Sequence, residues 1–352
     1  MHDKPTNPWL FSGPLDIAIF GGSALLSFVA LWVGYLAGVL HAETPDWTWI
    51  PAVLLVDVAH VYSTAFRIYL DPEERRRRPL LYTLMPLLGF LGGVALYGYG
   101  GPFLFWRVLA YAAVYHFVRQ QYGFVVLYRA RMGETDRASY WLDTLTIYAS
   151  TLYPLLYWHT HLPRGYTWFS AGDFFSLPLW VYYLTTPIYW ALLALYAGRA
   201  LWLRVKGQAA SHGKDLLVLT TVLCWYIGII TYNSDYAFTV TNVLLHGIPY
   251  LALIFWYGKR QPPSVGSIAR RVFTRGPWFF LLLLWGIAYV EELIWDRALW
   301  QDRSWFFGAP WEIGDWEMWL VPLLALPQLT HYLLDGFIWK RRQNPGIQRA
   351  LR

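Results

Sequence analysis

Long runs of apolar residues recur along the whole chain and limit the folds that it can adopt. Only 14% of its 352 residues are charged, whereas soluble domains usually carry nearer a quarter. An α-helix needs about 20 apolar residues to cross a bilayer, and lipid-exposed backbone must satisfy its own hydrogen bonds. The sequence therefore predicts about ten transmembrane helices. The predicted spans are 15–40, 48–70, 80–99, 103–128, 140–158, 177–198, 215–233, 236–258, 277–296 and 317–339.

The Lys and Arg residues of the loops predict how these spans are oriented. Loops 41–47, 100–102, 159–176 and 234–235 are nearly free of Lys and Arg, whereas the loops that alternate with them are basic. Because basic loops stay in the cytoplasm, we expect an all-α, polytopic bundle in a bacterial-type inner membrane, with both termini cytoplasmic. The basic set is Arg75-Arg76-Arg77-Arg78, Arg129/Arg131/Arg137, Arg199/Arg204/Lys206/Lys214, Lys259/Arg260/Arg270/Arg271/Arg275 and Lys340-Arg341-Arg342.

Composition limits the other classes of protein and of site. The net charge of +6 lies in short loops between spans, so it indicates topology and not a nucleic-acid partner. The single cysteine, Cys224, excludes thiolate-zinc and iron–sulfur sites. Residues 1–352 are expected to form one transmembrane domain, in which the ninth span is short and ends at Glu291-Glu292.

The nine histidines divide into two groups. One group lies in a terminus or in loops and is predicted to be exposed; two of its members, His159 and His161, can bind a metal only weakly. The members of this group are His2, His41, His159, His161 and His212.

The other four histidines, His60, His116, His246 and His331, each lie inside a different predicted span. These spans all run from outside to inside, and each histidine lies ten to fifteen residues past the outer end of its span. A helix rises about 1.5 Å per residue, so the four side chains share one layer near the midplane. Intramembrane ionisable groups are rare. We therefore predict that these imidazoles converge on a metal such as iron, zinc or copper. Four separate hydrogen bonds between helices are the alternative.

Each of these histidines has a polar companion one helical turn away. Metal-bound imidazoles normally donate their second ring proton to such an acceptor, although a bond between helices would use the same residues. Either aspartate among them can instead be a ligand. The companions are Asp57 for His60, Gln120 for His116, Asn242 for His246 and Asp335 for His331.

Two arginines lie in the spans near the cytoplasmic side. Arg119 follows His116 by three residues, and we predict that it neutralises a carboxylate or holds an anionic group. Arg67 is expected to extend to the interface instead. Gly123 and Gly247 are small residues on histidine-bearing helices, where they let backbones approach or leave room for a substrate.

The segment from Pro327 through His331 to Asp335 resembles the last motif of the Brp/Blh-type bacterial β-carotene 15,15′-dioxygenases. His116-Phe117 resembles a second motif of that family, and Asp57…His60 loosely resembles the first. The family's Pro-His-Gly and His-x-x-x-His signatures are absent as such. The resemblance implies a polytopic helical enzyme in which four histidines hold a non-haem iron. It does not imply the substrate, because one fold serves many functions.

The leading interpretation is an intramembrane metal-dependent oxidoreductase, an iron oxygenase that acts on an apolar lipid or isoprenoid. It would use Fe(2+), with zinc or haem b as alternatives, and an electron donor is a further expected partner besides membrane lipids and the apolar substrate. Asp335, Asp57, Gln120 and Arg119 are the predicted catalytic residues. A haem-b electron-transfer protein, a transporter or lipid-binding protein, and a zinc-dependent intramembrane hydrolase remain alternatives.

Overall fold

The computed structural model describes residues 7–340 and 344–351, and every regular element within them is a helix. His2, Arg341 and Arg342 lie outside the described residues. The elements are α1 (Gly13–Asp16), η1 (Ile17–Gly21), α2 (Gly22–Leu36), α3 (Asp46–Trp49), η2 (Ile50–Val58), α4 (Ala59–Arg67), α5 (Pro72–Arg77), α6 (Pro79–Met132), α7 (Arg137–Thr160), α8 (Trp180–Val205), α9 (His212–Trp225), η3 (Tyr226–Thr231), α10 (Asp235–Phe238), η4 (Thr239–Val243), α11 (Leu244–Arg260), α12 (Ile268–Arg275), α13 (Pro277–Trp295), η5 (Asp296–Trp300), α14 (Ser304–Phe307), η6 (Gly314–Trp316), α15 (Glu317–Leu324), α16 (Leu326–Ile338) and α17 (Pro345–Ala350).

Among the described residues, six continuous helical segments are long and apolar enough to cross a membrane. This agrees with the predicted all-α, multi-pass membrane protein. The count of ten spans and the cytoplasmic placement of both termini stay predictions. The six segments are Gly13–Leu36, Asp46–Arg67, Pro79–Met132, His212–Thr231, Asp235–Arg260 and Pro277–Trp300.

Three predicted span boundaries can be compared with the helices. Gly101 has a left-handed φ of 75° and precedes Pro102, so it divides the long helix α6 into two arms where a loop is predicted. The last predicted span is broken at Ala325 into α15 and α16. The predicted end of the ninth span at Glu291-Glu292 is wrong. The helix continues to Trp300, and the indole of Trp295 donates a hydrogen bond of 3.3 Å to the Glu291 carboxylate.

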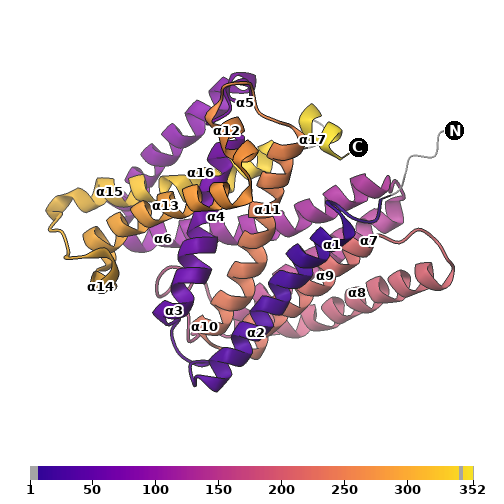
Figure 1. Cartoon of the computed structure of the whole chain (residues 1–352). Coiled ribbons are helices and arrows are strands. Elements are labelled where there is room, and N and C mark those ends of the chain that lie inside the picture. Colours follow the sequence, from indigo (N-terminus) through magenta and orange to yellow (C-terminus); the bar gives the residue numbers. More distant parts are fainter. Residues whose placement is uncertain (1–6, 341–343, 352) are drawn as a thin grey trace.

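The helices cross at several angles instead of forming one parallel bundle (Figure 1). In this view α4 and α11 stand upright in the middle of the molecule. The second arm of α6 and the helices α13, α15 and α16 cross them, while α2, α7, α8 and α9 run obliquely beside them. Helix α16 packs against α6, and α4 packs against both α11 and α13. The histidine-bearing helices are therefore neighbours at the centre.

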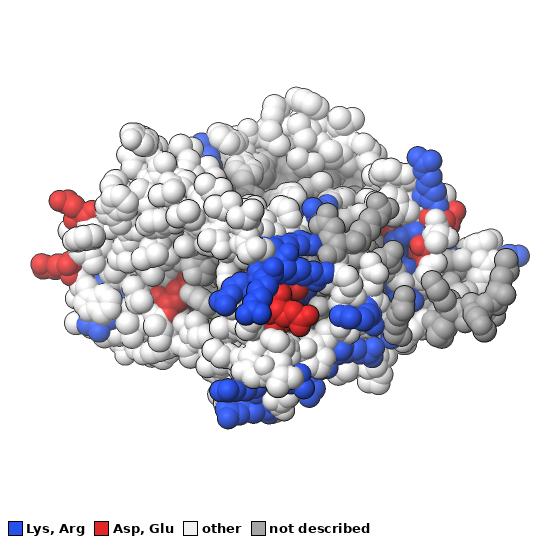
Figure 2. Space-filling model, turned by 90° about the horizontal axis from the view of Figure 1, so that it is seen from above, with Lys and Arg blue, Asp and Glu red and all other residues white. Residues whose placement is uncertain are grey.

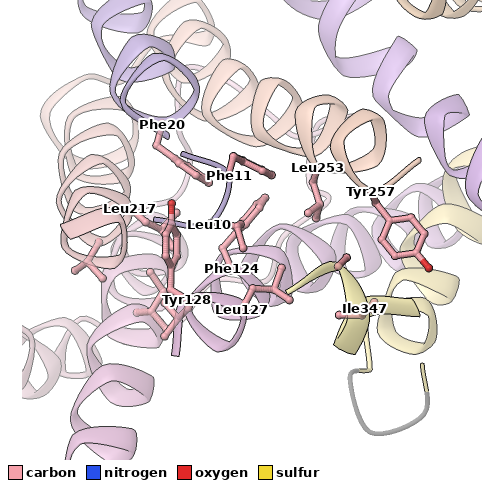
Figure 3. Close-up of a cluster of buried hydrophobic side chains, with 14 of the residues drawn as sticks. Leu10, Phe11, Phe20, Phe124, Leu127, Tyr128, Leu217, Leu253, Tyr257 and Ile347 are labelled. Atoms are coloured by element: carbon pink, nitrogen blue, oxygen red, sulfur yellow. The ribbon is translucent and has the colours of Figure 1, made fainter. Parts of the chain in front are cut away.

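Buried aromatic side chains fix the N-terminal segment against these helices (Figure 3). Phe20 packs edge-to-face on Phe124 of α6, with ring centroids 5.1 Å apart. The carboxylate of Asp16 accepts hydrogen bonds from the Leu10 backbone N–H at 2.7 Å and from the Tyr128 hydroxyl at 2.7 Å. This buried acceptor is satisfied by local backbone and by α6, so it is a structural contact.

Charged side chains gather at the end of the molecule that carries α5 and α12 (Figure 2). The last turn of α5 contains three residues of the predicted basic loop, Arg75, Arg76 and Arg77. One loop histidine departs from its prediction. His159 lies in the last turn of α7 and is buried, because its two ring nitrogens contact the Leu155 carbonyl at 2.6 Å and the Tyr111 hydroxyl at 3.0 Å.

Candidate metal centre

The four predicted intramembrane histidines meet inside the protein. His60 lies on α4, His116 on α6, His246 on α11 and His331 on α16. Each is only 1–2% exposed, and one nitrogen from each ring lies within 4.8 Å of one nitrogen from every other. The predicted convergence is therefore confirmed. We call these four residues the histidine centre.

Irregular helical turns orient two of these side chains. The π-helical segment η2 ends at Val58, two residues before His60, and η4 ends at Val243, three residues before His246. A π-helical turn adds a residue to the turn and so rotates the face of everything that follows. Gly247 brings these two helices together, because a Cβ there would lie 2.5 Å from Val56 Cγ1. Its predicted role as a close-approach residue is confirmed.

The nitrogens that face the middle of the centre have no ordinary hydrogen-bond partners. His116 Nε2 and His331 Nε2 are buried and unpaired. His60 Nε2 and His246 Nε2 lie 3.1 Å apart and face only each other. Two imidazoles bound to one ion at about 2.0–2.1 Å would place their nitrogens at roughly this separation. Because buried polar atoms are normally satisfied, this set of donors fits a metal ion.

Carboxylates lie behind three of the rings. Asp57 Oδ1 is 3.5 Å from His60 Nδ1. The two oxygens of Asp335 lie 3.8 Å from the Nδ1 atoms of His116 and His331. Metal-bound histidines usually have such a partner on the second nitrogen, since it fixes the ring and raises its basicity. Three of the four Nδ1 atoms thus face acids, whereas the Nε2 atoms face inward.

A chain of hydroxyl groups holds Asp335 and His331 in place. The Tyr250 hydroxyl donates to Asp335 Oδ1 at 2.5 Å and lies 2.8 Å from the Thr64 hydroxyl. Thr64 Oγ1 is in turn 2.8 Å from His331 Nδ1. The sequence analysis missed both hydroxyl residues. Thr64 follows His60 by four residues and Tyr250 follows His246 by four, so the one-turn spacing rule contained the signal.

Aromatic rings cover the sides of the centre. Phe117 stacks on His246 with centroids 3.6 Å apart and planes 7° from parallel. Tyr332 stacks on His116 at 5.0 Å and 27°. Both rings come from the residue directly after a centre histidine, on α6 and α16. They keep water from the imidazoles and hold the rings in one orientation.

Two predicted companions make other contacts. Gln120 donates its amide to the backbone carbonyl of His246 at 2.8 Å and does not reach the ring of His116. Asn242 donates to the Phe238 carbonyl at 3.3 Å and to Thr241 Oγ1 at 3.0 Å. Each side chain therefore stabilises the segment around His246, and the catalytic role predicted for Gln120 stays a prediction.

The two predicted intramembrane arginines do not pair with Asp57 or Asp335. Arg119 donates to the hydroxyl of Tyr148, and its guanidinium lies 4.8 Å from the ring centroid of Tyr122. Arg67 is the last residue of the segment Asp46–Arg67, and the expectation that it extends to the interface stays a prediction. Arg67 is 4% exposed, because Glu74 pairs with it at 3.2 Å.

The fold and the site together define a helical membrane protein whose crossing helices enclose a buried four-histidine cluster that can hold a metal ion. No protein-family model matches the chain, and no curated protein or solved structure matches it either.

Proposed function

We propose that this protein is an intramembrane metal-dependent oxidoreductase, an iron oxygenase that acts on a lipid or isoprenoid. The observation that carries this proposal is the histidine centre, in which inward-facing ring nitrogens lack partners. Its resemblance to the Brp/Blh-type dioxygenases points to the same metal and reaction class.

Charge balance supports a divalent ion. Four neutral imidazoles add no charge, while the carboxyl groups of Asp57 and Asp335 next to the rings can each release a proton when an ion binds. An isolated ion in a low-dielectric interior would be strongly disfavoured. One divalent cation therefore balances the two carboxylates. Imidazole ligands suit iron, copper and zinc, and the close spacing of the four rings favours a bare ion over a haem between them.

The side chains around the centre would prepare it for oxidation chemistry. When bound, ferrous iron supplies one-electron and dioxygen chemistry that amino-acid side chains lack. Tyr250, Thr64 and Asp335 orient the imidazoles through their hydrogen bonds. Phe117 and Tyr332 exclude water, which would quench reactive species.

An apolar groove lies beside the helices that carry His60 and His331, and we propose that the substrate occupies it. A cavity of about 400 Å³ lies between α13, α15 and α16 and reaches Tyr62 of α4. Its lining is apolar apart from Tyr62 and the Glu291 carboxylate. A hydrocarbon chain can occupy such a groove without losing polar contacts.

The test is metal analysis of anaerobically purified protein by mass spectrometry. We expect about one iron per chain, which is lost when His60, His116, His246 or His331 is replaced by alanine. His212→Ala is the matched control, because this exposed residue lies outside the centre. Zinc in place of iron would favour the hydrolase alternative. Metal-free protein in every preparation would refute the proposal.

A further inference from the structure

A second cavity adjoins the histidine centre on the other side of α16, and its chemistry differs from that of the apolar groove. It encloses about 200 Å³ between the second arm of α6, α11 and α16. His116 and Asp335 line one part of it, and Arg119 and Lys340 line another. We call it the Arg119 cavity. We propose that it binds the anionic head and the first carbons of an amphiphile beside His116 of the histidine centre, an inference that rests on the proposed function.

The two cations lie at one end of this cavity. Lys340 follows Asp335 by five residues and Arg119 follows His116 by three, so a rise of about 1.5 Å per residue displaces both along their helices from the histidine layer. Lys340 is exposed just past the end of α16, whereas His116 is buried. A ligand in the cavity thus meets two positive charges at its outer end and the histidine centre at its inner end.

The guanidinium of Arg119 is not neutralised by a carboxylate of the described residues, so it can hold an anion. It donates to Tyr148 and lies over the Tyr122 ring, and no carboxylate among the described residues is paired with it. Lys340 lies 4.7 Å from the ring centroid of Phe337, also without an ion pair among the described residues. A carboxylate or phosphate is the group that two such cations favour. The acid of the cavity, Asp335, is held by Tyr250 at the inner end.

Two glycines keep the cavity open. Gly123 of α6 and Gly336 of α16 both line it, and a Cβ at either position would meet no atom within 4 Å. Larger side chains would therefore fill the cavity without a clash. Because 200 Å³ is smaller than a usual ligand pocket, it takes the head and the first carbons, while the remaining chain lies along the apolar surface of the helices.

The apolar groove does not offer the same recognition. No Lys or Arg lines it, and its two ionisable side chains, Tyr62 and Glu291, offer no positive charge to an anionic head. The head is therefore assigned to the Arg119 cavity.

The experiment is equilibrium binding of radiolabelled palmitate to metal-free protein in a non-ionic detergent, with hexadecyl phosphate and hexadecanol as competitors. We expect palmitate and hexadecyl phosphate to bind, and hexadecanol to bind at least about tenfold more weakly. Arg119→Gln and Lys340→Gln should each weaken palmitate binding by about tenfold, whereas Lys259→Gln, an exposed lysine of α11, should not. Gly336→Leu should abolish binding, and Gly198→Leu, on α8 with equal free space, should leave it intact.

Equal binding of hexadecanol and palmitate would overturn this inference, as would an unchanged affinity in both cation variants. Displacement of palmitate by inorganic phosphate at equal concentration would show that the cavity binds free anions, and the inference that it binds an amphiphile would fail. If the protein contains iron but binds palmitate no more tightly than hexadecanol, only this inference fails and the proposed function stands. Palmitate binding in a protein that never holds metal would remove only the proposed function.

Discussion

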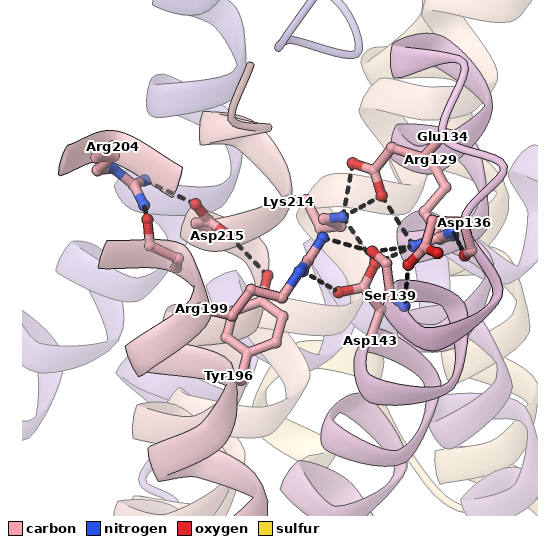
Figure 4. A network of polar contacts seen from close by, with 11 residues as sticks. Arg129, Glu134, Asp136, Ser139, Asp143, Tyr196, Arg199, Arg204, Lys214 and Asp215 are labelled. Atoms are coloured by element: carbon pink, nitrogen blue, oxygen red, sulfur yellow. Dashed lines mark hydrogen bonds and ion pairs between the residues drawn. The ribbon is translucent and has the colours of Figure 1, made fainter. Parts of the chain in front are cut away.

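Two buried polar clusters in this protein use their hydrogen bonds in opposite ways. The ionic cluster (Figure 4) joins α6, α7, α8 and α9. Its members are Arg129, Glu134, Ser139, Asp143, Arg199 and Lys214. No buried side-chain nitrogen or oxygen of this cluster lacks a partner among the described residues. In the histidine centre, each of the four rings keeps one unpaired nitrogen.

The difference separates a structural contact from a ligand site. Asp143 is fully buried and accepts from Lys214 at 2.7 Å, from Arg199 at 3.0 Å and from Arg129. The negative charge of Asp143 is therefore balanced by cations of the protein itself. An unsatisfied buried polar atom costs about 1–3 kcal/mol, so the histidine centre lowers the stability of the fold until something binds it. The inward-facing nitrogens of His116 and His331 are unpaired, and those of His60 and His246 face only each other, so the centre indicates a ligand.

The largest expected effect comes from opening the ionic cluster. Asp143→Ala leaves buried cations without their shared carboxylate and should lower the free energy of unfolding by about 3–5 kcal/mol. His246→Ala in metal-free protein should lower the free energy of unfolding much less, because it also removes a buried nitrogen that has no partner. Unfolding in mixed detergent, followed by circular dichroism, measures both.

The control for Asp143→Ala is Asp215→Asn. Asp215 pairs with Arg204, which is 39% exposed, at 2.7 Å. Such a pair contributes only about 0–1 kcal/mol. Equal losses in Asp143→Ala and in the control would contradict the assignment of the ionic cluster as a structural contact.

A smaller effect should appear in the histidine centre when its supporting carboxylate is neutralised. Asp335→Asn removes the negative charge behind His116 and His331, so metal affinity should fall about 10–100-fold while the protein stays folded. Competition with a chelator of known affinity measures the change. Asp46→Asn, an exposed acid paired with Arg303, is the control. Unchanged affinity in Asp335→Asn would separate this carboxylate from metal binding.

Much of this arrangement could be predicted, because it depends on properties that repeat along one helix. Apolar length predicted helices at the right places, and the 1.5 Å rise placed His60, His116, His246 and His331 in one layer. The one-turn spacing also identified Asp57 and Asp335. Contacts across helices could not be predicted in this way.

The contacts that could not be predicted share one physical cause, which is packing between segments far apart in sequence. Gln120 reaches the carbonyl of His246, 126 residues away, instead of a ring on its own helix. Arg67 is buried because α5 brings Glu74 back over it. His159 is buried because Tyr111 lies against it. No periodic pattern in a single span contains these partners.

The smallest effect concerns a third polar contact, the pair of Glu74 with Arg67. Burial acts to raise the pKa of Glu74, but Arg67 at 3.2 Å, the Tyr82 hydroxyl at 2.8 Å and Arg77 lower it, and the net pKa lies below its usual value. The folded state therefore binds this proton less readily than the unfolded state. Its stabilising contribution is present above the unfolded pKa of a glutamate and is lost as the pH falls through the folded pKa.

Glu74→Gln should consequently lower the unfolding free energy by about 1 kcal/mol at neutral pH, since the glutamine oxygen still accepts hydrogen bonds. The difference between wild type and variant should shrink as the pH falls below the usual glutamate range. Unfolding titrations at neutral and acidic pH check this, with Glu73→Gln on the exposed side of α5 as the control. A difference that is constant with pH would show that folding leaves the pKa of Glu74 unchanged, so that Arg67 does not stabilise its charge. Glu74 would then resemble the uncompensated groups of the histidine centre more than the matched charges of the ionic cluster.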